Sequence, residues 1–294
     1  MQKPYPVPPS YSFIHKGSFL ILLKEGYKDF LLQQGIDDFE DYLKRCGQPS
    51  PHLTGRTPHL SVSLKDGEKM VVRRYSHGGL LHVFTRGLYL FGSRAFQELA
   101  LTEEIRSSGI PTVQPISAVQ QAVFPFFYRA YFLSLEIPRA KDLPRRLQNI
   151  GPVPSAENLL KKREMIKRVG RLVRQFHQAG FFHRDLQLKN ILIAGNSPIL
   201  IDFDRSYRKK ALTLRDRIDN LLRLNRSVEK WRRAGLSITK TDRWRFFLAY
   251  SEGDQAVRKA LGEALRTYAI RFFPHRCIWA LQEVIKGTRG RGAE

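Results

Sequence analysis

Cysteine and long apolar runs are the scarcest features of this sequence. Of its 294 residues only Cys46 and Cys277 are cysteines, a number and spacing that fit neither a disulfide framework nor a metal site. We therefore expect two reduced, structural thiols in a cytosolic protein. No uncharged apolar run approaches the roughly 18 residues that a membrane-spanning helix needs, and no signal peptide or internal repeat is recognisable. These absences argue against disulfide-rich, membrane-spanning and repeat architectures.

Acidic residues are also scarce, with 27 Asp and Glu against 50 Lys and Arg, which gives a net charge of +23. Such a balance predicts a polyanionic partner: nucleic acid, an anionic membrane face or a phosphorylated substrate. The charge concentrates in residues 205–233, where eleven Lys and Arg face three acids for a net charge of +8. A basic stretch of this kind is more often a solvated helix face than a binding site. With 42% hydrophobic residues, the chain can still bury a sizeable core.

The strongest motif lies in residues 183–204, which read His-Arg-Asp-Leu-Gln-Leu-Lys-Asn and end in Ile-Asp-Phe-Asp. Asn190 follows Asp185 by the five-residue offset of a kinase catalytic loop. Phosphoryl transfer needs a carboxylate to orient and deprotonate the attacking hydroxyl, and oxygen ligands to hold Mg²⁺ against nucleotide phosphates. Asp185 is our candidate for the base, and Asn190 and Asp202 for the metal ligands. A short hairpin over residues 191–201 is expected to place Asp202 beside the loop.

The nucleotide side departs from the usual kinase pattern. Gly55 is the one glycine where a phosphate-covering, Gly-rich loop belongs, and Arg73 stands where kinases carry a strand lysine. Arginine can also bind phosphate or pair with a carboxylate, because its planar guanidinium group donates two parallel hydrogen bonds. Glu98 is its natural partner on the following helix, although an Arg–Glu pair alone would be an ordinary ion pair. Glu136 opens a segment expected to form the hinge.

The order of expected elements predicts an α+β, protein kinase-like, two-lobed fold. Its N-lobe is rich in β-strands with one αC-like helix, and its C-lobe is mainly helical. We divide the chain into an N-terminal extension (1–50), an N-lobe (51–136) and a C-lobe (137–294), with a basic helical segment at 205–233. The expected elements are an extended or poorly ordered arm (1–17), strands (19–23, 60–64, 70–75, 113–119 and 126–135) and helices (18–45 in part, 93–108, 155–178, 241–250 and 254–273).

From about Gly55 to Tyr250 the sequence resembles the bacterial lipopolysaccharide core kinases, the Kdo kinase and heptose kinase family of the kinase-like superfamily. The resemblance rests on Val71–Gly79, Arg94–Glu98, Ser108–Thr112, Phe182–Leu186 with Asn190–Leu192, Leu200–Arg205 and Leu236–Phe246. It implies a cytoplasmic enzyme, peripheral at the inner membrane, that uses ATP and Mg²⁺ to phosphorylate a sugar hydroxyl of a lipid A–core precursor. Asn190 and the Asp-Phe-Asp motif look more like the Kdo kinases than the heptose kinases.

The resemblance also implies roles for individual residues. Asp185 would be the base, Asn190 and Asp202 would bind Mg²⁺, and Arg73 with Glu98 would anchor phosphate. Five further residues near the motif are candidates for acceptor binding: Arg184, Gln187, Asp204, Arg205 and Arg208. The expected partners are the Kdo-containing lipid A–core precursor and an anionic membrane surface, with neither nucleic acid nor an obligate protein partner.

Three alternatives stay open at this point. A heptose kinase of the same family would share these motifs. A small-molecule or protein kinase-like phosphotransferase would share the active site, although no Ala-Pro-Glu anchor of a regulated protein kinase follows Asp202. A nucleic-acid-binding protein on a decayed kinase scaffold would fit the net charge. It would not explain why base and metal ligands are retained, and aromatic residues are not interleaved with the basic run.

Overall fold

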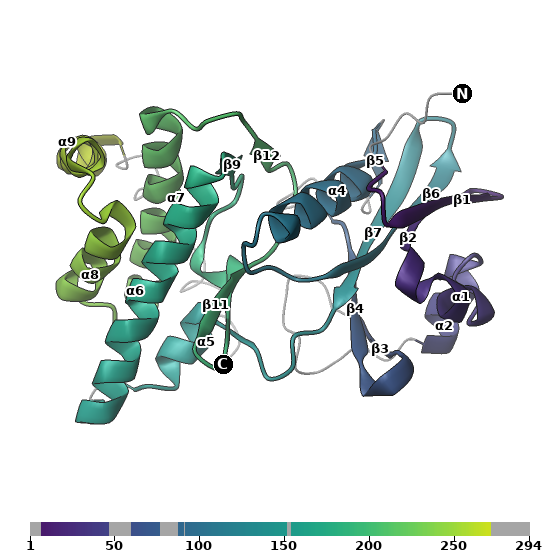
Figure 1. Cartoon of the computed structure of the whole chain (residues 1–294), viewed down its shortest axis with the longest axis horizontal. Helices are drawn as coiled ribbons and strands as arrows, with labels where there is room; N and C mark the ends of the chain where they lie inside the picture. Colours follow the sequence, from purple (N-terminus) through teal and green to yellow (C-terminus); the bar gives the residue numbers. More distant parts are fainter. Residues whose placement is uncertain (1–6, 47–59, 77–87, 91, 152–153, 272–294) are drawn as a thin grey trace, which may run out of the picture.

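The computed structural model describes residues 7–46, 60–76, 88–90, 92–151 and 154–271, with only the backbone for the last five of these. A sheet-rich part extends to residue 135, and a mainly helical part follows it (Figure 1). The predicted nucleotide-loop residue Gly55 and the second cysteine, Cys277, lie outside the described residues. The α+β class expected from the sequence is confirmed.

One seven-stranded antiparallel sheet forms the sheet-rich part, in the order β1-β2-β6-β7-β4-β3, with β5 paired to β7. The expected hairpin around Gly67 is present, with a short 3₁₀ turn, η1 (Lys65–Gly67), between its strands. The strands are β1 (Tyr11–Lys16), β2 (Phe19–Lys24), β3 (Leu60–Ser63), β4 (Lys69–Arg74), β5 (Tyr89–Leu90), β6 (Pro115–Phe124) and β7 (Phe127–Leu135).

The segment predicted as an N-terminal extension contributes to this sheet. Residues 11–16, expected in an extended or poorly ordered arm, instead form β1, which pairs with β2 across a two-residue turn. Gly17 adopts a φ of +57° in that turn, a conformation that suits a tight hairpin and that glycine tolerates best. The prolines upstream suggested irregular structure, but they end before the strand begins. The strand β2 then pairs with β6 in the middle of the sheet.

Helices cover both faces of the sheet, as the side-chain alternation of its strands requires. On β7, Ala130 and Phe132 point to one face, where α4 (Arg94–Ser107) packs, while Tyr131 and Leu133 point to the other. The second face is covered by α1 (Glu25–Gln33) and α2 (Phe39–Cys46), whose Phe39 is fully buried. The sheet therefore carries α4 in the expected αC-like position, and two further helices on its opposite face.

The helical part begins with a short strand and a helix, followed by the long helix α6 that the sequence predicts from Ser155. Its elements are β8 (Lys141–Asp142), α5 (Leu143–Gln148), α6 (Ala156–Gln178), β9 (Phe181–Phe182), η2 (Leu188–Asn190), β10 (Ile191–Ala194), β11 (Ser197–Leu200), β12 (Tyr207–Arg208), α7 (Leu214–Arg233), α8 (Lys240–Ser251) and α9 (Gln255–Arg271). Gly180 follows α6 at φ +86°, and a Cβ there would collide with the backbone carbonyl of Lys209. Only glycine lets the chain turn so tightly into the predicted catalytic loop, residues 183–190.

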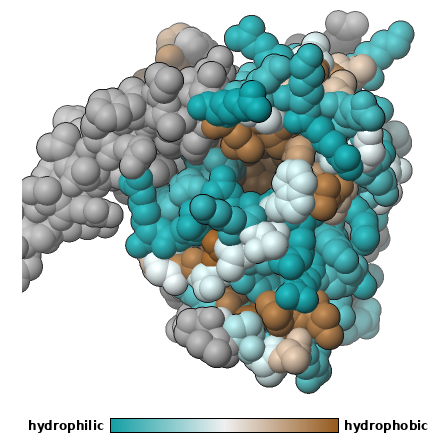
Figure 2. All heavy atoms as spheres, turned by 90° about the vertical axis from the view of Figure 1, so that its left-hand side faces the viewer, coloured by the Kyte–Doolittle hydropathy of each residue, from teal (hydrophilic) through white to brown (hydrophobic). Residues whose placement is uncertain are grey.

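The four long helices of this part pack around one hydrophobic core. Figure 2 shows the face of this part on which a hollow has apolar walls. Among the side chains that line it are Ile166, Leu188, Leu224, Phe246, Leu261 and Leu265. Because Leu188 belongs to the catalytic loop, the hollow reaches the underside of that loop. Within the described residues, none of the helices has the length and hydropathy to cross a bilayer.

Candidate active site

The segment that connects β9 to β10 is held in place by His183, whose side chain is fully buried. Its Nδ1 accepts a hydrogen bond from the Asp185 backbone N–H (3.1 Å), so the proton lies on Nε2, which donates to the carbonyl of Ile201 (3.1 Å). Burial lowers the pKa of His183, which keeps the ring neutral and preserves this pairing. One imidazole thus fastens the Asp185 backbone to the strand end that precedes Asp202.

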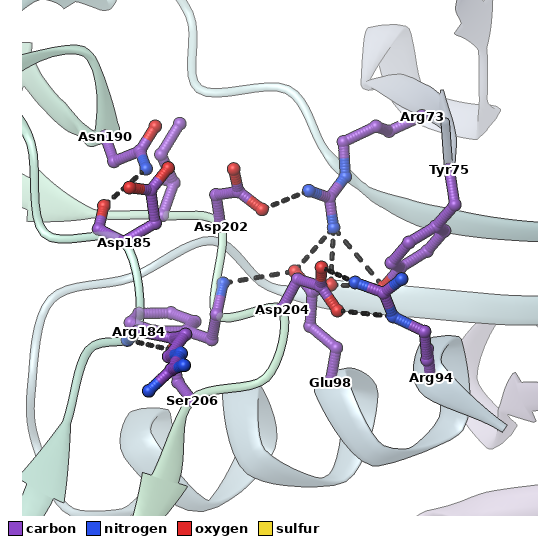
Figure 3. A network of polar contacts seen from close by, with 12 residues as sticks. Arg73, Tyr75, Arg94, Glu98, Arg184, Asp185, Asn190, Asp202, Asp204 and Ser206 are labelled. Carbon is purple, nitrogen blue, oxygen red and sulfur yellow. Dashed lines mark hydrogen bonds and ion pairs between the residues drawn. The ribbon is translucent and has the colours of Figure 1, made fainter. Parts of the chain in front are cut away.

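Asp185 and Asn190 are brought together by the 3₁₀ turn η2. The Asn190 side chain is buried, and its Nδ2 donates to the Asp185 carbonyl at 2.9 Å. Because the amide nitrogen is used in this way, the oxygen is the end that can serve a cation. The Asp185 side chain remains half exposed, and Gln187 Nε2 donates to its Oδ2 at 2.7 Å. The spacing predicted from the sequence therefore yields one cluster, which Figure 3 shows beside Asp202.

Asp202 lies between this cluster and the sheet-rich part, at the end of β11. Its φ of +67° is a left-handed conformation that aspartate tolerates better than most side chains. The Asp202 carboxylate pairs with Arg73 Nη1, and Arg73 Nη2 donates to both oxygens of Glu98 at 2.5 Å (Figure 3). One guanidinium on β4 therefore contacts both the helix α4 and the loop that carries Asp202, and its pairing with Glu98 is the one that the sequence predicted.

The Glu98 carboxylate is the buried centre of this network, with a side-chain exposure of only 2%. It accepts further hydrogen bonds from the Tyr75 hydroxyl and from the Phe203 backbone N–H (3.2 Å). Burial, together with the nearby carboxylates of Asp202 and Asp204, raises the pKa of Glu98 to about 7, although Arg73 opposes the shift. Arg73 itself stays protonated, because Glu98 and Asp202 hold its pKa well above the usual range against the effect of burial.

A second arginine, Arg94 on α4, pairs with Asp204 of the same loop. Its Nε donates to Asp204 Oδ1 at 3.0 Å and its Nη2 pairs with Oδ2, while its guanidinium lies 4.6 Å from the centre of the Tyr89 ring. Arg94 and Glu98 are four residues apart, so both reach the loop from one face of the helix. The sequence alone did not predict a role for Arg94. The four-residue spacing between Arg94 and Glu98 could have indicated that both side chains face the same loop. The partner of Arg94, Asp204, could not be found in this way because it lies 110 residues away in the chain.

The remaining predicted site residues are of two kinds: some make contacts within the protein, and the others have exposed side chains. Asp204 is engaged by Arg94, and Arg208 bonds Glu104 (2.5 Å) and the Ala179 carbonyl (3.2 Å), so both make structural contacts here. Glu136 donates its backbone N–H to Lys69 and accepts from Ser61 within the sheet-rich part. Arg184 and Arg205 are exposed. Arg184 lies near Asp185, with its backbone N–H bonded to Ser206 (Figure 3).

A buried polar network supports the catalytic loop from below. Asn220 of α7 donates to the His183 carbonyl (2.8 Å) and accepts from the His183 backbone N–H (3.2 Å). Its side-chain oxygen also lies 3.1 Å from His177 Nε2, and His177 Nδ1 lies 2.8 Å from the Tyr250 hydroxyl. The Asn220 oxygen can only accept a hydrogen bond, and the Tyr250 hydroxyl can donate one. The His177 ring is therefore neutral and carries its proton on Nε2. Helices α6, α7 and α8 are thereby joined to the loop through side chains that the sequence alone did not single out.

This network predicts that stability depends on pH through His177. Burial lowers the pKa of His177 to about 4, whereas the unfolded chain protonates histidine near pH 6.5. Between those values the unfolded chain binds the proton and the folded chain does not, so the free energy of unfolding falls as pH decreases. The full shift corresponds to about 3 kcal/mol at 1.36 kcal/mol per pH unit. Urea unfolding of the wild type and of His177→Gln at pH 7.5, 6 and 5 measures it. The difference between the two proteins should shrink as pH falls, and a constant difference would contradict the assignment.

A loop aspartate and asparagine beside a second aspartate, with a strand cation paired to a helix glutamate, is the arrangement of kinase-like phosphotransferases, in which that cation is usually lysine and here is Arg73. The comparisons with known proteins agree with this class. The profile of the lipopolysaccharide kinase (Kdo/WaaP) family matches residues 44–250. The chain belongs to this family, and it is a kinase of lipopolysaccharide core sugars.

Among curated proteins, the chain is similar to 3-deoxy-D-manno-octulosonic acid kinases. The one from Vibrio cholerae is 31% identical over 195 residues, covering 65% of this chain and 77% of the relative. The one from Pasteurella multocida is 29% identical over 228 residues, covering 74% and 89%. Among solved structures, WaaP in complex with acyl carrier protein superposes with a TM-score of 0.54 at 20% identity, covering 84% of this chain and 98% of WaaP. That similarity supports the fold.

Proposed function

We propose that this protein transfers the γ-phosphate of ATP to a hydroxyl of a 3-deoxy-D-manno-octulosonic acid (Kdo) residue in a lipid A-linked precursor. The observation that carries the proposal is the meeting of Asp185, Asn190 and Asp202 in one cluster, in which Asp202 pairs with Arg73 of the sheet-rich part (Figure 3). The similarity to several Kdo kinases supports the choice of acceptor over heptose. A heptose acceptor is the alternative within the same family.

In this proposal Asp185 is the general base, because its half-exposed carboxylate can accept the proton of an incoming hydroxyl. Gln187, which bonds Oδ2 of Asp185, orients that carboxylate. Arg73, which is held by Glu98, contacts the nucleotide phosphates as a fixed cation. The exposed side chains of Arg184 and Arg205 are candidates for contacts with the acceptor.

The residues present fit a Mg²⁺ ion that is shared with the nucleotide. Asn190 Oδ1 and the Asp202 carboxylate would hold it, and when bound it neutralises charge on the transferred phosphate. Both side chains offer the oxygen ligands that Mg²⁺ prefers, and the Asn190 amide nitrogen is already bonded to the Asp185 carbonyl, so the amide oxygen is the atom that would face the metal. Within the described residues, His, Cys, Asp and Glu form no cluster of three or more that would bind metal alone. We therefore expect metal binding to depend on nucleotide.

The proposal is tested by transfer of label from γ-labelled ATP to purified acceptors in the presence of Mg²⁺. The expected result is label on a lipid A precursor that carries Kdo, located on the Kdo residue by mass spectrometry. A precursor without Kdo is the control and should stay unlabelled. Label on heptose alone would favour the alternative acceptor, and label on soluble sugars alone would place the enzyme in another substrate class.

We also propose that the enzyme works at the cytoplasmic face of the inner membrane as a peripheral protein. The support is the net charge of +23 and the basic helix α7, because each Lys or Arg near an anionic leaflet contributes about 1 kcal/mol. We expect sedimentation with anionic vesicles in low salt and release as salt rises, since screening shortens to about 10 Å at 0.1 M. Neutral vesicles are the control. Binding that is independent of salt, or equal on neutral vesicles, would contradict this prediction.

A further inference from the structure

One face of α7 is fixed against the catalytic loop at two points. Asn220 brackets the backbone of His183, with bonds of 2.8 and 3.2 Å, and Ser227 Oγ accepts from the Leu188 backbone N–H at 3.1 Å. These two residues are seven apart, which is two helical turns, so they lie on the same side of α7. Together they set both the register and the rotation of the helix relative to the loop.

Arg223 projects from that face between the two anchors, one turn after Asn220. Its Nη1 lies 4.0 Å from Asp185 Oδ1, and its side chain is about one-third exposed. The distance is that of a loose ion pair and exceeds a hydrogen bond. The other oxygen of Asp185 is taken by Gln187. The guanidinium therefore lies beside the proposed base at more than hydrogen-bonding distance.

Arg223 has two cationic neighbours. Burial and the neighbouring cations Arg226 and Arg184 lower its pKa, and they outweigh the opposite effects of Asp185 and Asp219. Asp219 is itself within 4.0 Å of Arg215. Arginine stays protonated even so, which means that Arg184 and Arg226 lie close enough to Arg223 to repel it. An anionic group bound among them would relieve that repulsion.

We propose that Arg223, with Arg184 beside it, binds the carboxylate of the sugar-acid acceptor and so holds the reacting hydroxyl at Asp185. This inference rests on the proposed function. A guanidinium matches a carboxylate through two parallel hydrogen bonds, which fixes orientation as well as distance. A neutral core sugar such as heptose would lack that partner. Arg223 would thus be a residue that determines the choice of acceptor, in contact with the substrate rather than with the transferred phosphate.

The test compares Arg223→Gln with Arg215→Gln in the full chain. Arg215 is a matched control, since it lies on the same helix with its side chain 92% exposed. Arg223→Gln should raise the KM for the Kdo acceptor by about 10- to 100-fold, the range for losing a charge-assisted hydrogen bond. The KM for ATP should stay unchanged, because in the proposed function the nucleotide phosphates contact Arg73 rather than Arg223. Arg223→Lys should recover only part of the loss, because it keeps the charge without the fork.

An acceptor whose carboxyl group is converted to the amide shows whether Arg223 binds the carboxylate of the sugar or a phosphate of the lipid. The wild type should lose about as much affinity for the amide as Arg223→Gln loses for the acid, and the variant should no longer distinguish acid from amide. If Arg223→Gln instead abolishes discrimination between phosphorylated and dephosphorylated lipid acceptors, the site binds phosphate and the inference is wrong. Equal kinetics of Arg223→Gln and Arg215→Gln would also overturn it. Wild-type protein that labels no Kdo acceptor would refute the proposed function instead.

Discussion

Replacing Asp185 by asparagine is expected to lower kcat for phosphoryl transfer by about 10²- to 10⁴-fold, the range for removing a general base. The amide cannot accept the hydroxyl proton, yet it keeps the size of the side chain. The fold should survive, because the carboxylate is half exposed and the Asp185 backbone makes the bonds to His183 and Asn190. Initial rates at saturating ATP and acceptor measure the effect, with circular dichroism as the check on folding.

Asp219→Asn is the matched control for this variant. Asp219 is also an exposed aspartate near the catalytic loop, but it pairs with Arg215 on the surface of α7. Its replacement should change kcat by no more than a few-fold. Retention of more than a tenth of the wild-type rate by Asp185→Asn would mean that another group takes the proton.

The largest effect on stability is expected for Asp242→Ala, which should lower the free energy of unfolding by about 3–5 kcal/mol. Asp242 and Lys162 form an ion pair at 2.8 Å with side-chain exposures of 2% and 7%. Removing one partner leaves the other charge buried and unpaired. Asp242 also accepts the Thr239 backbone N–H in the capping box that starts α8, and that bond is lost as well. Urea unfolding at pH 7.5 measures the change.

The exposed pair of Lys161 and Glu157 on α6 provides the comparison. Glu157→Ala should change stability by less than about 1 kcal/mol, since surface ion pairs contribute little. Adding Lys162→Met to Asp242→Ala should restore part of the loss, because the unpaired ammonium is then gone. If Asp242→Ala unfolds at the same urea concentration as Glu157→Ala, the buried pair does not hold α6 against α8.

Local patterns explain why so much of the site was predictable. The offset from Asp185 to Asn190 and the hairpin before Asp202 depend on residues close together in the chain, and such short-range geometry follows from sequence. Amphipathic spacing likewise predicted α6 from Ser155, where the structure begins it at Ala156. The position of Ser93 before α4 was also right, although its side chain makes no capping bond.

The contacts of the site that the sequence did not predict join segments that are far apart in the chain. The bond from Arg94 to Asp204 and the approach of Arg223 to Asp185 depend on how helices pack, and helix packing leaves no mark at a single position. The strand β1 was hidden for a different reason, because prolines just upstream dominated the local composition. Even Arg208, which basic charge suggested for the acceptor, bonds Glu104 across the structure.

The central claim is that Asp185, Asn190 and Asp202 surround one metal-bound nucleotide. A crystal structure with Mn²⁺ and a non-hydrolysable ATP analogue tests it directly, because Mn²⁺ replaces Mg²⁺ and its anomalous signal marks its position. A peak is expected about 2.0–2.2 Å from Asn190 Oδ1 and an Asp202 carboxylate oxygen, with the terminal phosphate facing Asp185. A nucleotide bound elsewhere, or a metal that contacts neither side chain, would contradict it.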